Sequence, residues 1–410
     1  MTKSLVAAVA AAVALAVGSY AASPIAAAQD KPTVSRDAAK PLKAAQDAAQ
    51  AKKFDESIAK AQEALALPKA TAYDKYVANQ MLAFAYANKR DTANLSKAME
   101  AQLASGFVTG TEKNNILKNL ASVAYQDKNY AKAVDMGRQL ISAGGGDAET
   151  YTLVAQSYYL QNKYGDAAKF LGDYVANQER NGQQPKEQSL QLISDSYLKL
   201  GNNAASTATL EKLVRYYPKP IYWNNLLYSM MRADGITDKH TLHIYRLMYD
   251  TGTLKQGSDY TEMAQIAMDQ GTPGEAVSVL EAGMAANVFD DKTSKDRNQR
   301  LLDAAKKAAA TDKASLPKFE AEAKAAANGE ADIALGRGYL SYGMNAQAEE
   351  ALARGIGKGG LKNPADAQIL LGVAQLRQKE NANAVKSFNA VKTADANLER
   401  IAKLWALHAS

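Results

Sequence analysis

The sequence predicts an all-α protein, a right-handed superhelical solenoid of about ten helix pairs with a C-terminal capping helix. The first observation is a unit of roughly 34 to 39 residues that recurs along the chain, with Ala133 and Ala167 standing 34 residues apart. The small or apolar residue at this phase recurs at Ser57, Leu95, Ala133, Ala167, Ser206, Ala276, Ala348 and Ala384. A fixed period in this range is typical of stacked helical units, each of which contacts only its neighbours.

Two further observations indicate that these units are helix pairs. From Asp37 onward, apolar and small residues recur at i, i+3, i+4 and i+7, and no stretch alternates with period two, so we expect essentially no sheet. Short breaks such as Asn129 and Lys163 separate the two helices of a unit, and longer Gly- and Pro-rich breaks such as 143–147 and 217–220 separate units. Glycine tolerates the left-handed turn after a helix, and proline lacks the donor needed to continue one.

The first 28 residues have the features of a secretory signal peptide. Lys3 gives a charged start, residues 5–17 form an apolar run, and Ala26-Ala27-Ala28 provides a small-residue cleavage site. We expect export to the periplasm, cleavage after Ala28, and a disordered linker over 29–36. The alternative is an uncleaved membrane anchor, although the apolar run is shorter than the roughly 20 residues that span a bilayer.

The remaining chain is predicted to form two arrays. The first covers 37–289, a weakly patterned helical joint covers 290–330, and the second array with its cap covers 331–410. The joint is rich in Ala and Lys and has few large apolar residues, while residues 236–254 lack a clean small residue. The last helix, Leu398 to His408 with Trp405, is expected to cover the exposed face of the last pair.

The composition excludes several classes of function. The chain has no cysteine, so it offers no lipidation site for a lipoprotein, no disulfide framework, no thiolate nucleophile and no thiolate metal site. The net charge of +6 is mild and scattered, which favours solubility or a loose attraction to anionic surfaces over nucleic-acid binding. We expect no nucleic-acid partner and, after cleavage, no integral membrane segment.

Motifs for catalysis are weak. His240 and His243 lie on one helix face that a metal could use, but no acidic or histidine partner stands near them in the sequence. The sequence contains no phosphate-binding loop of the G-x-x-x-x-G-K-S/T type and no G-x-S-x-G elbow. Gly336-Arg337-Gly338 lies within a helical pattern, and Asp290-Asp291 is an acidic pair in a turn. We therefore predict no enzyme, no cofactor and no metal site.

The first helices of the units are the better place to look for a binding surface, because in such arrays they line the inner face. Asn224, Tyr228 and Arg232 fall at i, i+4 and i+8, which places them in one stripe. An amide, a phenol and a guanidinium could hold an extended peptide, and the alternative is an ordinary solvated face. The predicted groove residues are Gln156, Tyr159, Asp195, Lys199, Asn224, Tyr228 and Arg232.

The repeat pattern resembles the tetratricopeptide repeat (TPR) over about residues 38 to 393. That family places a large residue, a Leu-Gly or Leu-Ala step and a Tyr in the first helix, and an Ala with aromatic or Leu neighbours in the second. The copies that fit best contain Tyr151, Val154-Ala155, Tyr158, Tyr164, Ala167 and Leu171; Leu190, Ile193, Tyr197, Leu210, Leu213 and Pro218; Leu335-Gly336, Tyr339, Ala348 and Leu352; and Leu371-Gly372, Ala384 and Phe388. The resemblance implies the helical solenoid and a role in binding proteins.

Part of the chain, roughly 205–392, is similar to a narrower group, the exported TPR proteins of Gram-negative TonB systems. The similar segments are 210–223, then 254 with 259–264 and 273–283, then 358–362 with 370–374. The resemblance implies a periplasmic accessory of the TonB–ExbB–ExbD machinery, with TonB, ExbD or outer-membrane receptors as partners. It assigns no functional residue. Two rivals stay open, a scaffold for envelope assembly or polysaccharide export and a solute- or peptidoglycan-binding protein with a closed polar pocket.

Overall fold

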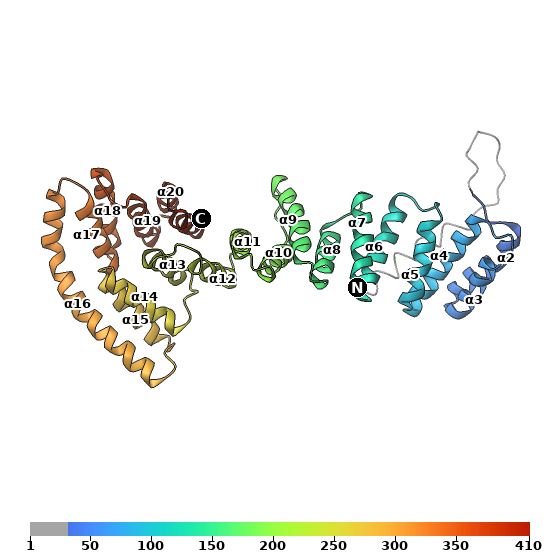
Figure 1. Ribbon diagram of the computed structural model, residues 1–410, viewed down its shortest axis with the longest axis horizontal. Coiled ribbons are helices and arrows are strands. Elements are labelled where there is room, and N and C mark those ends of the chain that lie inside the picture. The colour runs from blue at the N-terminus through green and yellow to red at the C-terminus, as the bar shows by residue number, and fades with distance from the viewer. Residues whose placement is uncertain (1–31) are drawn as a thin grey trace. The chain divides into compact units, whose positions relative to one another are not determined.

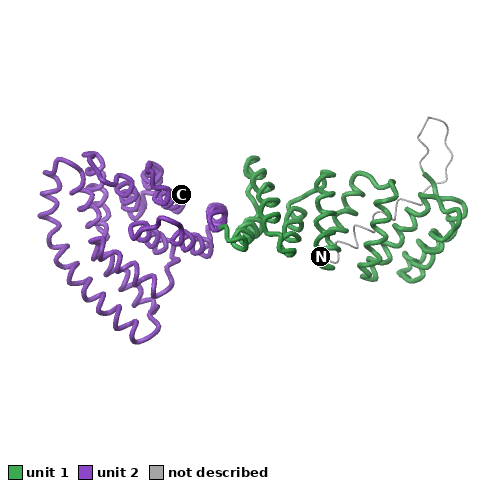
Figure 2. The backbone as a smooth tube through the Cα atoms, in the orientation of Figure 1, with its two compact units in different colours: residues 1–202 green, residues 203–410 purple. Residues whose placement is uncertain are grey.

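The computed structural model describes residues 32–410, and all regular structure in that range is α-helical (Figure 1). This confirms the predicted fold class, with helices packed in consecutive antiparallel pairs. The chain divides into two compact units, residues 1–202 and 203–410, shown in different colours in Figure 2. The predicted signal peptide lies outside the described residues, and Ser35 of the predicted linker caps the first described helix and donates its backbone N–H to Asp74.

The first unit stacks helix pairs in chain order. Its helices are α2 (Arg36–Gln50), α3 (Phe54–Leu65), α4 (Ala72–Lys89), α5 (Thr92–Ala104), α6 (Gly110–Gln126), α7 (Tyr130–Ser142), α8 (Ala148–Leu160), α9 (Tyr164–Arg180) and α10 (Glu187–Lys199). Each helix packs on the next, and the first helices of successive pairs also touch, as α2 touches α4 and α8 touches both α6 and α10. Because the first helices approach one another most closely, they form the inner face of the unit.

Local sequence sets where these helices begin and which residues they bury. The side chains of Asp91, Asn129 and Asp147 accept hydrogen bonds from backbone N–H groups in the first turns of α5, α7 and α8. The small residues that mark the repeat, Ala133 and Ala167, are almost completely buried where two helices cross, as predicted. Burying a large apolar side chain beside such a position stabilises the fold by about 1.5–3 kcal/mol, so the repeat itself builds the core.

The second unit continues with helices of less uniform length. They are α11 (Asn203–Tyr216), α12 (Pro220–Met231), α13 (Asp238–Asp250), α14 (Gly257–Asp269), α15 (Pro273–Ala285), α16 (Lys292–Ala325), α17 (Glu330–Ser341), α18 (Asn345–Lys358), α19 (Pro364–Arg377), α20 (Asn381–Asn389) and α21 (Ala396–Ala409). Glycines allow close crossings here: a Cβ on Gly336 would lie 2.5 Å from the Leu352 Cγ, and one on Gly372 would lie 2.5 Å from the Phe388 Cε1.

The segment predicted as a joint, 290–330, contains a single helix of 34 residues, α16. Its few large side chains are enough to hold it, since Leu302 and Leu316 are buried on one face. The hydroxyls of Tyr339 and Tyr342 donate to Glu320 and Asp312 of α16. The division into compact units falls at 202/203 instead, because α16 packs on both α15 and α17 and so continues the second unit.

The last helix does more than the predicted cap. α21 packs on α20, but it also contacts α13 and α19. Its Trp405 is fully buried, stacks on Phe388 and lies beside His408, which in turn meets Trp223 of α12 edge to face. The beginning and the end of the second unit are therefore joined, and α13 is enclosed between them. This enclosure explains why the segment around α13 has no small residue: most of α13, from His240 to Met248, is buried on all sides.

Candidate functional site

The predicted groove residues of the first unit lie on its inner helices. Gln156 and Tyr159 are half-buried on α8, and Asp195 and Lys199 are exposed on α10. Although much of the Asp195 side chain is exposed, the neighbouring protein displaces some of the water around its carboxyl and raises its pKa, and the Lys199 ammonium one turn further on opposes that rise. α8 and α10 are in contact, and these four residues offer an amide, a phenol, a carboxyl and an ammonium.

A pair of tyrosines recurs where the two helices of a unit are joined, and of these four residues only Tyr159 was predicted to line the groove. Tyr159 packs edge to face against Tyr164, with ring centroids 5.0 Å apart. One repeat earlier, Tyr125 packs in the same way against Tyr130 at 5.8 Å. The two pairs are 34 residues apart, so the period that revealed the fold also carried this signal. All four rings are half-buried, which leaves part of each ring exposed for contact with a ligand.

The stripe of Asn224, Tyr228 and Arg232 lies in the second unit, where much of its polarity is used within the chain. The Asn224 side chain donates to the carbonyl oxygen of Thr253 at 3.3 Å. The Tyr228 hydroxyl donates to Asp259, and burial together with this bond raises the pKa of Tyr228. Asn224 and Tyr228 thus tie α12 to the segment that contains the start of α14, while Arg232 lies at the end of its helix and is exposed.

Tyrosine-to-carboxylate bonds of this kind recur between neighbouring helices. In the first unit, the Tyr76 hydroxyl donates to Glu112 at 2.6 Å, and the Gln80 amide also donates to Glu112. In the second unit, Tyr245 donates to Glu262 at 2.8 Å. Burial is the main cause of the raised pKa of Tyr76 and of Tyr245, and the carboxylate that each contacts adds to it. These bonds satisfy polar groups between repeats, which is a structural use of tyrosine.

Each of the two histidines has an acidic partner that is distant in the sequence. The Nε2 of His240 lies 2.7 Å from the carboxylate of Asp395, and the Nε2 of His243 lies 2.8 Å from that of Asp366. These carboxylates are 155 and 123 residues away in the sequence and reach the histidines only because α13 lies against α19 and α21. Both bonds therefore belong to the closure of the second unit.

The interior around α13 is a network of paired charges. Arg246 binds Glu275 through two hydrogen bonds of 2.7 and 2.6 Å. The carboxylate of Asp366 accepts from His243 on one oxygen and from Arg337 on the other, at 2.9 Å. Burial opposes ionisation of Asp366, but these two donors hold the pKa of that carboxyl below its usual range. The polar groups converge as they would in a ligand pocket, yet they bind one another and fill the space.

This network predicts a specific pH dependence. Burial lowers the pKa of His243, and the charges of Arg246 and Arg337 also oppose its protonation. Below about pH 6.5, the unfolded chain binds a proton at this imidazole and the folded chain does not, so the stability falls as the pH falls. Between pH 7.5 and pH 5.0, the free energy of unfolding should fall in the wild type. In His243→Gln we expect this fall to be smaller by about 1–2 kcal/mol.

Denaturant unfolding followed by circular dichroism at both pH values measures this difference. The glutamine side chain in the His243→Gln variant retains a donor for Asp366 and removes the titrating group. Burial also lowers the pKa of His408 and raises that of Asp250, and these effects have opposite signs on acidification. Both groups are present in the two chains, so they cancel in the comparison. Parallel pH profiles for wild type and variant would contradict the assignment of a neutral, buried His243.

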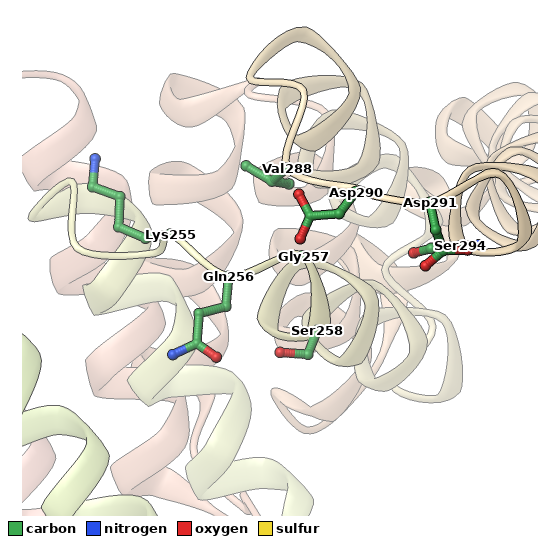
Figure 3. A pocket seen from close by; sticks show the side chains of 8 residues that line it. All are labelled: Lys255, Gln256, Gly257, Ser258, Val288, Asp290, Asp291 and Ser294. Atoms are coloured by element: carbon green, nitrogen blue, oxygen red, sulfur yellow. Dashed lines mark hydrogen bonds between the residues drawn. The ribbon is translucent and has the colours of Figure 1, made fainter.

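A cavity of about 550 Å³ lies where α14 and α16 begin (Figure 3). Polar side chains of Lys255, Gln256, Asp290 and Asp291 contribute to its lining. The Asp291 carboxylate is engaged in capping α16, where it accepts from the Ser294 N–H at 2.8 Å. Asp290 is exposed, as expected for an acidic pair in a turn. In residues 32–410, no group of three or more His, Asp or Glu side chains is arranged to hold a metal ion.

The Gly336-Arg337-Gly338 segment is helical, as the sequence pattern indicated, and lies within α17. Gly336 permits the close crossing with α18, and Arg337 belongs to the Asp366 pair. Among the residues described, no helix has both the length and the apolar character needed to cross a membrane.

Comparison with known proteins finds distant likenesses. No protein-family model and no curated protein matches the chain. Solved structures with similarity include the C-terminal part of a TPR repeat-containing protein from Cytophaga hutchinsonii (11% identity, 64% of this chain and 95% of that one, TM-score 0.34). A TPR protein from Parabacteroides merdae (12%, 81% and 98%, TM-score 0.31) and yeast Tom70 (12%, 91% and 96%, TM-score 0.26) are also similar.

These likenesses are distant and carry no argument about activity or partners. The fold stands on the molecule itself: consecutive antiparallel helix pairs, buried small residues at a period of 34 to 39, and first helices in contact across repeats.

Proposed function

We propose, from the premise that the chain is a tetratricopeptide-repeat solenoid, that it is a protein–protein interaction scaffold whose first unit binds an extended segment of a partner. The observation that carries this proposal is a repeated contact between a tyrosine near the end of an inner helix and one at the start of the next helix, Tyr125 with Tyr130 and Tyr159 with Tyr164. Partly exposed rings one repeat apart, beside the amide of Gln156, suit a peptide with apolar side chains and a backbone that needs hydrogen bonds.

The contrast between the two units supports this division of labour. The buried charged groups of the enclosed helix of the second unit, α13, are paired within the chain: His243 binds Asp366 and Arg246 binds Glu275. The inner helices of the first unit expose Asp195 and Lys199 and half-expose Gln156 and Tyr159. A partner can therefore contact the first unit without displacing an existing bond network, whereas the interior of the second unit is occupied.

Photo-crosslinking tests which face is used. A photoreactive phenylalanine analogue replaces Tyr125 or Tyr159 on the inner helices. The control positions are Gln139 of α7 and Ala176 of α9, two exposed residues on the second helices. We expect crosslinks to a partner from positions 125 and 159 only. The double variant Y125S/Y159S should lower recovery of that partner about 10- to 100-fold, as loss of aromatic contacts does at interfaces, while Q139S/A176S should not. Crosslinks mainly from 139 and 176 would overturn the inner-face assignment.

For the cellular setting, we propose a periplasmic accessory of the TonB–ExbB–ExbD energy-transduction system. The signal-peptide pattern of residues 1–28 supports export, and the resemblance over roughly 205–392 to exported TPR proteins of TonB systems supports the link. No residue is assigned to this role. The alternative scaffold function, in envelope assembly or polysaccharide export, requires the same fold and differs only in its partners.

Crosslinking of the exported protein in cells, followed by mass spectrometry, separates these two settings. Recovery of TonB, ExbD or an outer-membrane receptor supports energy transduction. Recovery of export or assembly proteins with none of these removes the TonB assignment and leaves the scaffold proposal in place. Because crosslinks are also mapped to positions 125 and 159, failure of the cellular setting and failure of the binding face are distinguishable.

A further inference from the structure

The turns that join the two helices of each pair in the first unit share an unusual backbone conformation. Lys52, Arg90, Lys128 and Asn162 all have positive φ, between 58° and 59°. The left-handed region costs a residue with a side chain roughly 1–2 kcal/mol, which is why glycine is the usual choice there. Three of these four positions nevertheless carry a long cationic side chain.

At most other positions with positive φ the residue is glycine, and the exceptions among the described residues are Asn287 and Lys379. Between the pairs of the first unit, positive φ occurs at Gly106, Gly144 and Gly182, and a Cβ added at any of them would meet nothing within 4 Å. Glycine also takes the positive φ in the turns at Gly271 and Gly343 of the second unit. The backbone therefore does not demand lysine or arginine in these turns, and the cations need another reason.

The four turns lie along one edge of the first unit. Lys89, at the end of α4, forms an ion pair with Asp55 at the start of α3, which links the first turn to the second. The Thr92 hydroxyl donates to Asp127 at 3.2 Å, which links the second turn to the third. Contacts of α8 with α6 and α7 continue the stack to the fourth. Adjacent helices pack about 8–10 Å apart, so successive turns recur at a spacing of that order.

Charge is concentrated on this edge, which we call the basic edge, residues 51–53, 89–91, 127–129 and 161–163. It carries six lysines or arginines against two aspartates, whereas the opposite turns, 66–71, 105–109, 143–147 and 181–186, carry two lysines and one aspartate. Lys53 and Lys89 are paired with Glu56 and Asp55. The remaining four cations are exposed and form no ion pair with a described residue: Lys52, Arg90, Lys128 and Lys163.

We propose that the basic edge docks the first unit onto the surface of an anionic lipid bilayer. Each of the four cations comes from a separate turn, one repeat apart, so together they match a surface of many separate anionic groups. An acidic peptide would instead be held by cations that converge on one groove. Basic side chains near an anionic membrane surface each add about fivefold to binding. The docking does not rest on the proposed peptide binding, although the turns 127–129 and 161–163 lie between the two tyrosines of each pair.

The test uses residues 29–410, which include every described helix. One set of vesicles contains zwitterionic lipid alone, and the other also contains roughly 30–40% anionic phosphatidylglycerol, which gives the vesicle a strong negative surface charge. We expect sedimentation with the anionic vesicles only, abolished at high salt because the interaction is screened. Replacing Lys52, Arg90, Lys128 and Lys163 by Gln should weaken binding at least about a hundredfold. The matched control replaces four exposed lysines near the opposite turns, Lys69, Lys75, Lys113 and Lys186, and should bind almost normally.

A second variant separates docking from a structural role of the turns. In K52G/R90G/K128G, glycine relieves the backbone cost, so the melting temperature should stay the same or rise while vesicle binding falls by about two orders of magnitude. Equal loss of binding in the basic-edge and control variants would mean that only net charge matters and would overturn the proposal. Binding to polyglutamate but not to anionic vesicles would also overturn it, in favour of an acidic protein partner.

Discussion

Arg246→Met is expected to destabilise the protein by about 3–5 kcal/mol, because it leaves the Glu275 carboxylate buried without its cation. The Arg246 and Glu275 side chains are only 7% and 9% exposed and are joined by two short hydrogen bonds. Burial alone would raise the pKa of Glu275, but the guanidinium reverses that effect and lowers it. Glu275→Gln should cost a similar amount, since the buried guanidinium then faces a neutral amide.

The double variant R246M/E275L provides the control. Well-packed apolar side chains can replace a buried ion pair at little cost, so the double variant should be more stable than either single variant. Chemical denaturation of the wild type, R246M, E275L and the double variant, followed by circular dichroism, gives the coupling free energy. A loss below about 1 kcal/mol for Arg246→Met would show that the pair is solvated in solution, in conflict with a closed interior around α13.

Trp405→Ala is expected to cost about 3–5 kcal/mol, the range for removing a large buried aromatic side chain. Trp405 is 0% exposed, stacks on Phe388 with centroids 5.7 Å apart, and lies 6.2 Å from the His408 ring. Its indole N–H has no hydrogen-bond partner among the described residues. Trp405→Phe removes that unsatisfied donor and keeps an aromatic ring, so it should cost much less than the alanine substitution.

Tryptophan fluorescence distinguishes loss of closure from a local defect. The chain has two tryptophans, and in Trp405→Ala only Trp223 remains. Trp223 of α12 is buried, and its ring packs edge to face against that of His408 of α21, with ring centroids 5.9 Å apart. If α21 detaches, Trp223 becomes exposed to water and its emission shifts to the red. Full stability with unshifted emission in this variant would show that α21 is not needed to hold the two ends of the unit together.

Much of the fold could be predicted because it is encoded over short distances. The 34-residue spacing between Ala133 and Ala167 predicts that α7 and α9 are equivalent helices with corresponding buried faces. Glycine and proline mark where helices end. The joint was harder to interpret, since Ala and Lys favour a helix of any length and two buried leucines decide that α16 packs on its neighbours. The boundary at 202/203 has no comparable sequence signal.

The candidate site could be predicted only in part. The positions of Gln156 and Tyr159 on an inner helix follow from the repeat, and the same period would have identified Tyr125. The hydrogen bonds of Asn224 and Tyr228 were not predictable, because the groups they contact follow a further helix of unknown placement. The positive φ of Lys52, Arg90 and Lys128 is likewise a property of the folded turns.

The sequence by itself determined a helical repeat, since its period records contacts between each unit and the next. Only the tertiary structure decided that α13 would meet α19 and α21, bringing His243 to Asp366 across 123 residues. That contact depends on the small rotation of each repeat relative to the one before it, added up over several repeats. The spacing of residue types along the sequence does not reveal this total rotation. The same meeting of distant helices places the paired charges of His243 and Asp366 in the interior of the second unit.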